Sequence, residues 1–316
     1  MDVTAADVLD AYRRIEGGVR RTPIVADPIL SEAHGAAVRL KLECWQETGS
    51  FKLRGALNRV ARLTPEERSR GLIAVSAGNH AFAVAHAAAA LGLDFLAVMP
   101  RHAPQVKVEG VRRLGAQVVL RGETYDEAAV AAAELERETG RTFVHPFEQP
   151  DVIAGQGTVG LEMALQEPLP EVVLVPAGGG GLIVGVAVVV KALSPRTRVI
   201  GVQSEASAPF VAAAKAGRHV PVAFGPSLAD GLHGDTTPDM VDIALRHVDG
   251  FVAVSEAAIR HAVRHLFATR RLVVEGSGAV GVAALMEGVA PPGSTTAILS
   301  GGNIDPATLL EVVGTL

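Results

Sequence analysis

The sequence has few of the features that stabilise secreted or membrane proteins. Its 316 residues include one cysteine, Cys44. A single thiol cannot form an internal disulfide framework, and it is typical of the reducing cytoplasm. The most apolar stretch, GLIVGVAVVVKAL, is interrupted by Lys191 before it reaches the about 20 residues that a membrane-spanning helix needs. Since the first residues, MDVTAADVLDAYRRIEGG, also lack an apolar run of the signal-peptide kind, we expect a soluble, cytoplasmic protein.

An excess of basic residues is lacking as well. The chain has 29 Lys and Arg against 34 Asp and Glu, which gives a formal net charge of -5. Nucleic acid and anionic membranes are both negatively charged, and neither favours a mildly acidic surface. We therefore expect neither of them as the main partner.

Several common catalytic and metal-binding motifs are missing. The sequence contains no G-x-x-x-x-G-K-[ST], H-E-x-x-H, G-x-S-x-G or C-x-x-C. The string GSGAVG, Gly276 to Gly281, matches the dinucleotide fingerprint, but no acidic residue follows at the required distance of about 20 residues, so we interpret it as a coincidence. His261 and His265 have the i, i+4 spacing of metal ligands. Because they lie off the apolar stripe of their helix and have no carboxylate partner, we predict a solvated face and no metal site.

The sequence does contain a recurring strand and helix unit. Nearly continuous apolar runs, such as LIAVSA, EVVLVPA and RVIGVQ, each lead through a turn into an Ala-rich or Val-rich helical pattern. This alternation is typical of parallel sheets covered by helices on both faces, so the sequence predicts an α/β fold. With 48% hydrophobic residues, the chain is long enough for a large core and for two subdomains. In such folds ligands bind beyond the carboxyl ends of the strands.

Lys52 stands at an unusual place for a cation. The stripe Leu53, Ala56, Leu57 and Val60 predicts a buried helix face, with Ser50 at the N-cap position. The positive end of a helix dipole disfavours an ammonium group in the first turn. An amine that must be neutral and nucleophilic benefits from that position, so Lys52 is a candidate catalytic residue.

Three turns that follow apolar strands contain glycine or polar residues. GGGGL, Gly178 to Leu182, opens a helix, and its bare backbone N–H groups can converge on a phosphate. SAGNHA, Ser76 to Ala81, offers a hydroxyl, an amide and an imidazole at a helix N-terminus, a set that suits a carboxylate or a phenolic oxygen. LSGGN, Leu299 to Asn303, places a serine at the end of the last strand.

Together, SFKLRGA, SAGNHA, GGGGL and LSGGN, in this order and spacing, resemble the fold-type II pyridoxal-phosphate enzymes, most closely the serine/threonine dehydratase and serine racemase branch. The resemblance covers nearly the whole chain and includes HPF, VIAGQGT and ADGL. It implies two domains, each with a twisted, mostly parallel sheet flanked by helices, and an active site in the cleft between them. Residues 1–63 and 148–316 would form the large domain that binds pyridoxal 5'-phosphate (PLP). Residues 64–147 would form the small domain that carries SAGNHA.

The resemblance also implies a role for individual residues. Lys52 would be the Schiff-base lysine, with Phe51 beside the cofactor ring, and Ser300 would face the pyridine nitrogen. Asn79 would bond the ring's 3'-oxygen, and Glu275 is a further candidate. The phosphate would be held by the glycine-run backbone, namely Gly178, Gly179, Gly180, Gly181 and the Leu182 amide. The substrate carboxylate would be received by Ser76, Ala77, Gly78, Asn79 and His80.

Two departures from the family pattern bear on the reaction. Ala77 stands where racemases of this branch carry a second serine, so the resemblance favours dehydration over efficient racemisation. Gln203 replaces a glutamate that helps to bind a divalent cation in many members, so we expect no magnesium site.

We therefore expect a PLP-dependent ammonia-lyase that converts L-threonine or L-serine to a 2-oxo acid and ammonia, and that forms a homodimer. The alternatives within the fold are a dehydratase of another 3-hydroxy amino acid, such as 3-hydroxyaspartate, phenylserine or a hydroxyectoine-pathway intermediate, and a serine racemase. A β-replacement synthase is less compatible, because cysteine synthases use a different cradle string. Outside the fold, a nicotinamide dehydrogenase or a non-catalytic phosphate binder remains open.

Overall fold

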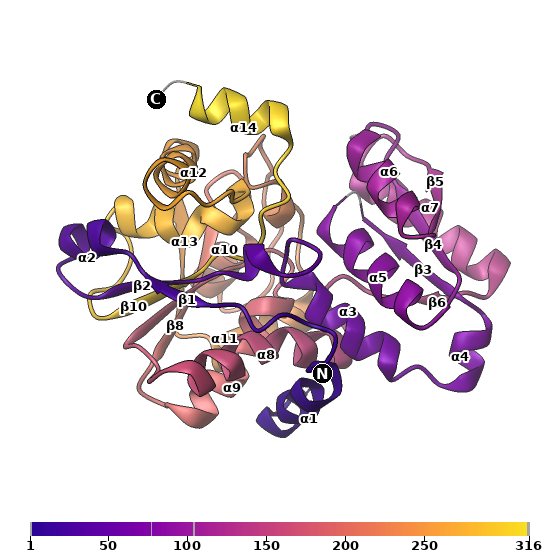
Figure 1. Ribbon diagram of the computed structural model, residues 1–316, viewed down its shortest axis with the longest axis horizontal. Coiled ribbons are helices and arrows are strands. Elements are labelled where there is room, and N and C mark those ends of the chain that lie inside the picture. Colours follow the sequence, from indigo (N-terminus) through magenta and orange to yellow (C-terminus); the bar gives the residue numbers. More distant parts are fainter. Residues whose placement is uncertain (1, 77, 104, 315–316) are drawn as a thin grey trace.

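The computed structural model describes residues 2–76, 78–103 and 105–314, which form two separate sheets (Figure 1). The six-stranded sheet has the order β1 (Ile24–Ala26), β2 (Val38–Lys41), β10 (Thr295–Ile298), β7 (Val172–Pro176), β8 (Arg198–Ser204) and β9 (Gly250–Val254). The β1 strand runs antiparallel to β2, and the other neighbours are parallel. The four-stranded sheet is parallel throughout, with the order β5 (Gln117–Leu120), β4 (Phe95–Met99), β3 (Leu72–Val75) and β6 (Thr142–Phe143).

Helices cover both faces of the six-stranded sheet. One face packs against α1 (Ala5–Ile15), α8 (Pro150–Gln166), α9 (Gly181–Leu193), α10 (Pro209–Ala216) and α11 (Pro238–His247). The other face packs against α2 (Pro28–His34), η2 (Asp230–Leu232), α12 (Glu256–Arg270), α13 (Gly276–Met286) and α14 (Pro306–Val313). Alternate residues of β7 enter the two cores, with Val172 and Leu174 on one side and Val173 and Val175 on the other. The continuous apolar strand thus follows from burial on both faces.

The four-stranded sheet repeats this arrangement on a smaller scale. Helices α3 (Lys52–Ala61), α5 (Asn79–Ala90) and α6 (Gln105–Arg113) share one core with it, while α7 (Tyr125–Thr139) covers the opposite face. The short α4 (Pro65–Ser69) precedes β3, and the 3-10 helix η1 (Glu43–Trp45) follows β2. Helix-covered, largely parallel sheets confirm the α/β prediction.

Helix α3 lies between the two sheets and contacts both α5 and α8. Its apolar stripe enters the core of the four-stranded sheet, as the sequence pattern predicts. On its other side, a Cβ atom at Gly155 would lie 2.6 Å from the Arg54 carbonyl oxygen, so α3 and α8 can cross this closely only because the residue there is glycine. The helix that begins at Lys52 is therefore held from two sides.

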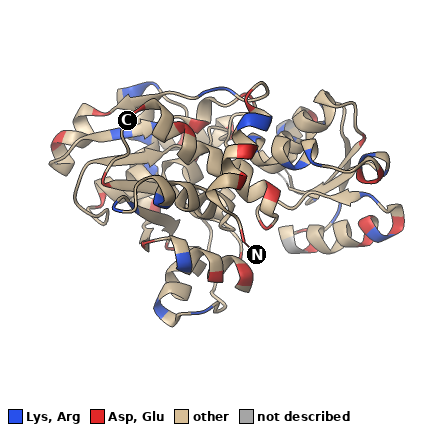
Figure 2. Cartoon of the chain, turned by 90° about the horizontal axis from the view of Figure 1, so that it is seen from below, with Lys and Arg blue, Asp and Glu red and all other residues tan. Residues whose placement is uncertain are grey.

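Charged residues are spread over both parts of the chain, with Lys and Arg interspersed among Asp and Glu (Figure 2). Among the described residues, no helix combines the length and the apolar character needed to cross a bilayer.

Candidate active site

Lys52 begins α3, and its side chain is half-buried. Its Nζ donates a hydrogen bond of 2.8 Å to the Pro146 carbonyl oxygen and lies 5.3 Å from the centroid of the Phe51 ring. Within the part of the chain that the structure describes, no carboxylate lies within ion-pair distance of this amine. Burial lowers the pKa of Lys52 to about 8, although the carboxyl group of Glu275 opposes the shift. The amine is thus closer to neutrality than an ordinary lysine.

The helix start differs from the prediction in one respect. Phe51 occupies the N-cap position in a helical conformation, with φ -55° and ψ -23°, and no side chain caps α3. Ser50 lies one residue too early because its backbone pairs with Gly301 in an extended bridge. Its Oγ is buried and has no hydrogen-bond partner among the described residues. The predicted Ser50 cap is therefore wrong.

The pairing with the segment that follows β10 brings Ser300 next to Phe51, the residue before Lys52. The Phe51 N–H donates to the Ser300 carbonyl oxygen at 3.0 Å, and the Gly302 N–H donates to the Gly49 carbonyl oxygen at 2.9 Å. Ser300 is 3% exposed. Residues far apart in the sequence thus meet at one edge of the six-stranded sheet, beyond the carboxyl end of β10.

The glycine run connects β7 to α9 in a crowded space. Gly180 has φ +102°, a conformation that favours glycine, and a Cβ atom at Gly179 would lie 2.3 Å from the Phe147 ring. No side chain caps α9, so the N–H groups of its first turn are not used by a cap. Leu182 is buried in the first turn. Because Phe147 follows Pro146, the same segment contacts the Lys52 amine and the glycine run.

The SAGNHA turn follows β3 and opens α5 at Asn79. The Ser76 hydroxyl accepts a hydrogen bond from the Gly78 N–H at 3.1 Å, and the ideal Cβ position of Gly78 is 3.8 Å from the Lys107 Nζ. His80 is buried with Nε2 2.9 Å from the Val144 carbonyl oxygen. Burial, helped by the charge of Lys52, lowers the pKa of His80 to about 3, so its ring is neutral. Ala77 lies outside the described residues.

Asn79 connects this turn to the opposite side of the site. Its Nδ2 donates to Glu275 Oε1 at 2.7 Å, and its Oδ1 accepts from Asn303 Nδ2 at 2.7 Å. Glu275 is buried just before α13, and burial raises its pKa to about 7, with a further contribution from the charge of Asp230. Asn303 had no predicted role, although it is the last residue of LSGGN and could have been selected with that motif.

The structure forms two groups from the predicted site residues. Lys52, Phe51 and Ser300 are connected through the backbone pairing, and Phe147 adds the glycine run to them. Asn79 and Glu275 form the second group.

The metal candidates have other roles. Among the residues that the structure describes, no group of three His, Cys, Asp or Glu side chains could hold a metal ion. Gln203 donates to the Ala177 carbonyl oxygen and accepts from the Val211 N–H. His261 is exposed, as predicted, but His265 has the carboxylate partner that the sequence did not reveal, with Nε2 3.1 Å from Asp27 Oδ2.

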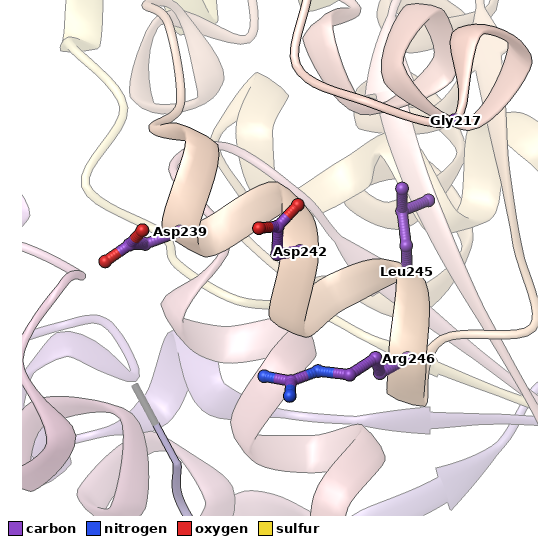
Figure 3. A pocket seen from close by; sticks show the side chains of 5 residues that line it. All are labelled: Gly217, Asp239, Asp242, Leu245 and Arg246. Atoms are coloured by element: carbon purple, nitrogen blue, oxygen red, sulfur yellow. The ribbon is translucent and has the colours of Figure 1, made fainter.

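A surface depression between the end of α10 and helix α11 is shown in Figure 3. The side chains of Asp242 and Leu245 point toward the turn at Gly217. The remaining lining residues are Asp239 and Arg246. This depression contains none of the predicted site residues, which lie instead beyond the carboxyl ends of the strands.

Known proteins resemble this chain in sequence and in structure. Residues 15–301 match the family described as "Pyridoxal-phosphate dependent enzyme". L-threonine ammonia-lyase of Thermotoga maritima is 47% identical over 308 residues, which cover 96% of this chain and 76% of that protein. The catabolic L-threonine dehydratase TdcB of Escherichia coli K12 is 39% identical over 321 residues, which cover 99% of this chain and 97% of that protein.

Solved structures agree with this assignment. Maize serine racemase superposes with a TM-score of 0.94 at 32% identity, covering 100% of this chain and 98% of that chain. The processed form of threonine deaminase isoform 2 from Solanum lycopersicum superposes with a TM-score of 0.90 at 35% identity, covering 98% of this chain and 91% of that chain. Sequence and fold together confirm the predicted resemblance and the predicted cofactor: the chain belongs to the family of pyridoxal-phosphate dependent enzymes, in their fold type II.

Proposed function

We propose that the chain is an ammonia-lyase that removes water from L-threonine or L-serine and releases 2-oxobutanoate or pyruvate together with ammonia. The observation that carries this proposal is the Lys52 amine, whose pKa is lowered to about 8 by burial and which donates to the neutral Pro146 carbonyl oxygen. The relatives named L-threonine ammonia-lyase and L-threonine dehydratase support the substrate.

The residues around Lys52 fit PLP. The backbone at Gly178 to Gly181 has no room for side chains, with Phe147 beside Gly179, and its N–H groups would hold the phosphate. Asn79 keeps one amide N–H that is not used by Glu275, and that N–H can donate to the 3'-oxygen. Ser300 would face the pyridine nitrogen, and Phe51 would flank the ring. When bound, PLP supplies an aldehyde for the substrate amine and a ring that withdraws electrons.

Lys52 would act as the general base that takes the Cα proton of the substrate. A base with a pKa near the working pH is both available and strong enough for this transfer. The α-carboxylate would be received by the SAGNHA turn, where the first N–H groups of α5 attract an anion. Ser300, a neutral residue, would leave the pyridine nitrogen without a proton and disfavour a long-lived carbanion. We infer that the β-hydroxyl therefore leaves rapidly, which favours elimination.

A serine racemase is the second candidate, because maize serine racemase superposes closely. Racemisation would need a serine at position 77 to return the proton from the opposite face of the ring, and this chain has Ala77 there. We therefore place elimination first.

A substrate panel separates these functions. Purified, PLP-loaded protein is incubated with L-threonine, L-serine, 3-hydroxyaspartate and phenylserine, and 2-oxo acid release is measured, with chiral analysis of the remaining serine. We expect the fastest 2-oxo acid release from L-threonine or L-serine and little D-serine. Faster formation of D-serine than of pyruvate would support the racemase. Activity only on another hydroxy amino acid would contradict L-threonine and L-serine as the substrates.

We also propose the domain boundaries of residues 1–63 with 148–316 and of residues 64–147, a homodimer and a cytoplasmic location. The two sheets support the boundaries, since all strands of the four-stranded sheet lie between Leu72 and Phe143. Light scattering on the purified protein tests the oligomeric state, and a monomer that keeps full activity would contradict the proposed homodimer.

A further inference from the structure

We propose that Glu275 is a positioning residue that fixes the side-chain amide of Asn79 so that an N–H, and not the carbonyl oxygen, faces the bound cofactor. This inference rests on the proposed function, because it concerns the groups that hold PLP. The geometry of a hydrogen-bonded chain from Thr48 to Glu275 supports it.

The chain begins at a group whose polarity is certain. Asn303 Nδ2 donates to the Thr48 main-chain carbonyl oxygen at 2.9 Å, and a carbonyl oxygen can only accept. The atom of Asn303 at this position must therefore be the nitrogen. The same Nδ2 lies 2.7 Å from Asn79, so the Asn79 atom that faces it must be the acceptor Oδ1. The Thr48 carbonyl oxygen therefore identifies which end of the Asn79 amide is oxygen and which is nitrogen.

Glu275 fixes the other end of that amide. Asn79 Nδ2 lies 2.7 Å from Glu275 Oε1, which accepts one of its two N–H groups. The second N–H stays available for an acceptor in the site, and the 3'-oxygen of PLP is such an acceptor. Without Glu275, the bond from Asn303 would hold the oxygen end of the amide but not its nitrogen end, so the remaining N–H could turn away from the cofactor.

The carboxyl group itself is enclosed and cannot move away easily. A Cβ atom at Gly301 would lie 2.2 Å from Glu275 Oε1, so the carboxyl rests directly against the LSGGN turn. The Glu275 N–H donates to the Gly301 carbonyl oxygen at 3.1 Å, and the Glu275 carbonyl oxygen accepts from the Gly278 and Ala279 N–H groups at the start of α13. Backbone and carboxyl are thus both held, as a positioning residue requires.

The surroundings of Glu275 bring its neutral and ionised forms to similar populations near pH 7. Burial and the charge of Asp230 raise its pKa to about 7, whereas Asn79 and Lys107 oppose the rise. Lys107 Nζ lies 3.6 Å from Asp230 Oδ2, so these two neighbouring charges partly cancel. The charge of the Glu275 carboxyl group also acts to raise the pKa of Lys52 and of Cys44. A neutral carboxyl group still accepts through its carbonyl oxygen, so the Asn79 contact does not require the charge.

The test compares two substitutions that differ only in the acceptor. Glu275→Gln keeps a carbonyl oxygen for Asn79, whereas Glu275→Leu keeps the approximate volume and removes it. PLP dissociation constants are measured by equilibrium dialysis of the apoprotein, and the visible absorption of bound PLP is recorded. We expect Glu275→Leu to weaken PLP binding about tenfold and to shift the absorption, and Glu275→Gln to stay within about threefold of the wild type. Equal losses in both variants would overturn the proposal.

A double-mutant cycle tests whether Glu275 acts through Asn79. In an Asn79→Ala background, Glu275→Leu should add less than about twofold to the loss of PLP affinity, since the amide that it positions is gone. Losses that multiply fully would contradict the inference. Urea unfolding of each apoprotein shows whether a variant has lost its fold, and Glu275→Gln keeps the comparison valid if Glu275→Leu is unstable.

The proposed function can fail separately. A wild-type protein that binds no PLP, or releases no 2-oxo acid from any substrate of the panel, would contradict the function itself. A wild-type protein that binds PLP and is active, with Glu275→Leu indistinguishable from it in PLP affinity and absorption, would contradict only the role of Glu275.

Discussion

Lys41 is fully buried and Lys52 is half-buried, and the groups that contact their amines differ in charge. Lys41, at the end of β2, is fully buried, with Nζ 2.5 Å from Glu162 Oε1 and further bonds to the Thr22 carbonyl oxygen at 2.8 Å and Gln166 Oε1 at 3.0 Å. For Lys52, the hydrogen-bond acceptor that the described residues provide is the neutral Pro146 carbonyl oxygen. Burial lowers the pKa of both lysines. The carboxylates of Glu43 and Glu162 oppose this shift for Lys41, and the carboxyl group of Glu275 opposes it for Lys52.

This difference distinguishes a lysine whose charge stabilises the fold from a lysine whose amine is available for catalysis. Lys41 belongs to a buried cluster with Arg54, Glu43 and Glu162, in which two cations and two anions balance. Such a cluster is stable only while it is complete, because a charge left alone in the interior is costly. Among the described residues Lys52 has no ion-pair partner, and the charge of Glu275 offsets its burial only in part, so its amine is destabilised as a cation and available as a base. The same residue type is thus used for folding at one position and for chemistry at the other.

The largest expected effect is on catalysis at Lys52. Lys52→Met should lower kcat/KM for 2-oxo acid formation by at least about 10⁴-fold, because the general base is lost. The variant should fold and be at least as stable as the wild type at pH 7, since a cation that is costly to bury is replaced by an apolar side chain of similar length. Measurement of 2-oxo acid release and of the urea unfolding midpoint tests both parts. Residual activity above about 1% of wild type would contradict the role of Lys52.

The matched substitution at the other lysine should have the opposite result. Lys41→Met leaves the carboxylate of Glu162 without one of its two cationic partners, and we expect a loss of about 3–5 kcal/mol in the free energy of unfolding. Urea denaturation followed by circular dichroism measures this value. If Lys41→Met were as stable as Lys52→Met, the distinction between the two lysines would be wrong.

A substitution in the glycine run should disturb only the Lys52 side. Gly179→Ala places a Cβ atom 2.3 Å from the Phe147 ring and should displace the segment whose Pro146 carbonyl binds the Lys52 amine. We expect PLP binding to weaken about tenfold, by the usual cost of overpacking. Gly17→Ala is the control, because no atom lies within 4 Å of a Cβ there. Similar PLP affinity in Gly179→Ala and wild type would exclude the glycine run from the site.

The last prediction concerns the pH dependence of the free energy of unfolding. The folded-state pKa of Lys52, about 8, lies below its usual value of 10.5, so the cost of burying its ammonium is fully present below pH 8 and disappears as the pH rises toward 10.5. The apoprotein should therefore gain about 2–3 kcal/mol of stability relative to Lys52→Met between pH 7 and pH 10. Urea midpoints of both proteins at the two pH values measure the difference. A constant difference would show that Lys52 is not destabilised as a cation.

The sequence predicted what depends on local pattern. Apolar strands followed by turns and helices were sufficient for the α/β fold, and the family motifs identified Lys52 and the glycine run. The expected preference of Lys52 for the neutral form agrees with its lowered pKa, although burial, and not the helix terminus, is the first cause. The site roles themselves remain predictions.

Long-range contacts could not be predicted. Asn79 meets Glu275 across 196 residues, Lys41 meets Glu162 across 121, and His265 meets Asp27 across 238. No local periodicity encodes such pairs, because they depend on how strands order themselves in the sheet. The Ser50 error has the same origin, since the extended pairing of Ser50 with Gly301 displaced the start of the helix.

Chemical mapping of the reactive lysine tests the central claim most directly. The PLP-loaded protein is reduced with borohydride, which fixes PLP covalently onto the amine that it has joined, and the modified peptide is identified by mass spectrometry. We predict the label on Lys52 alone, with Lys41 unmodified inside its cluster. Label on Lys41 or Lys107, or no label at saturating PLP, would contradict the account.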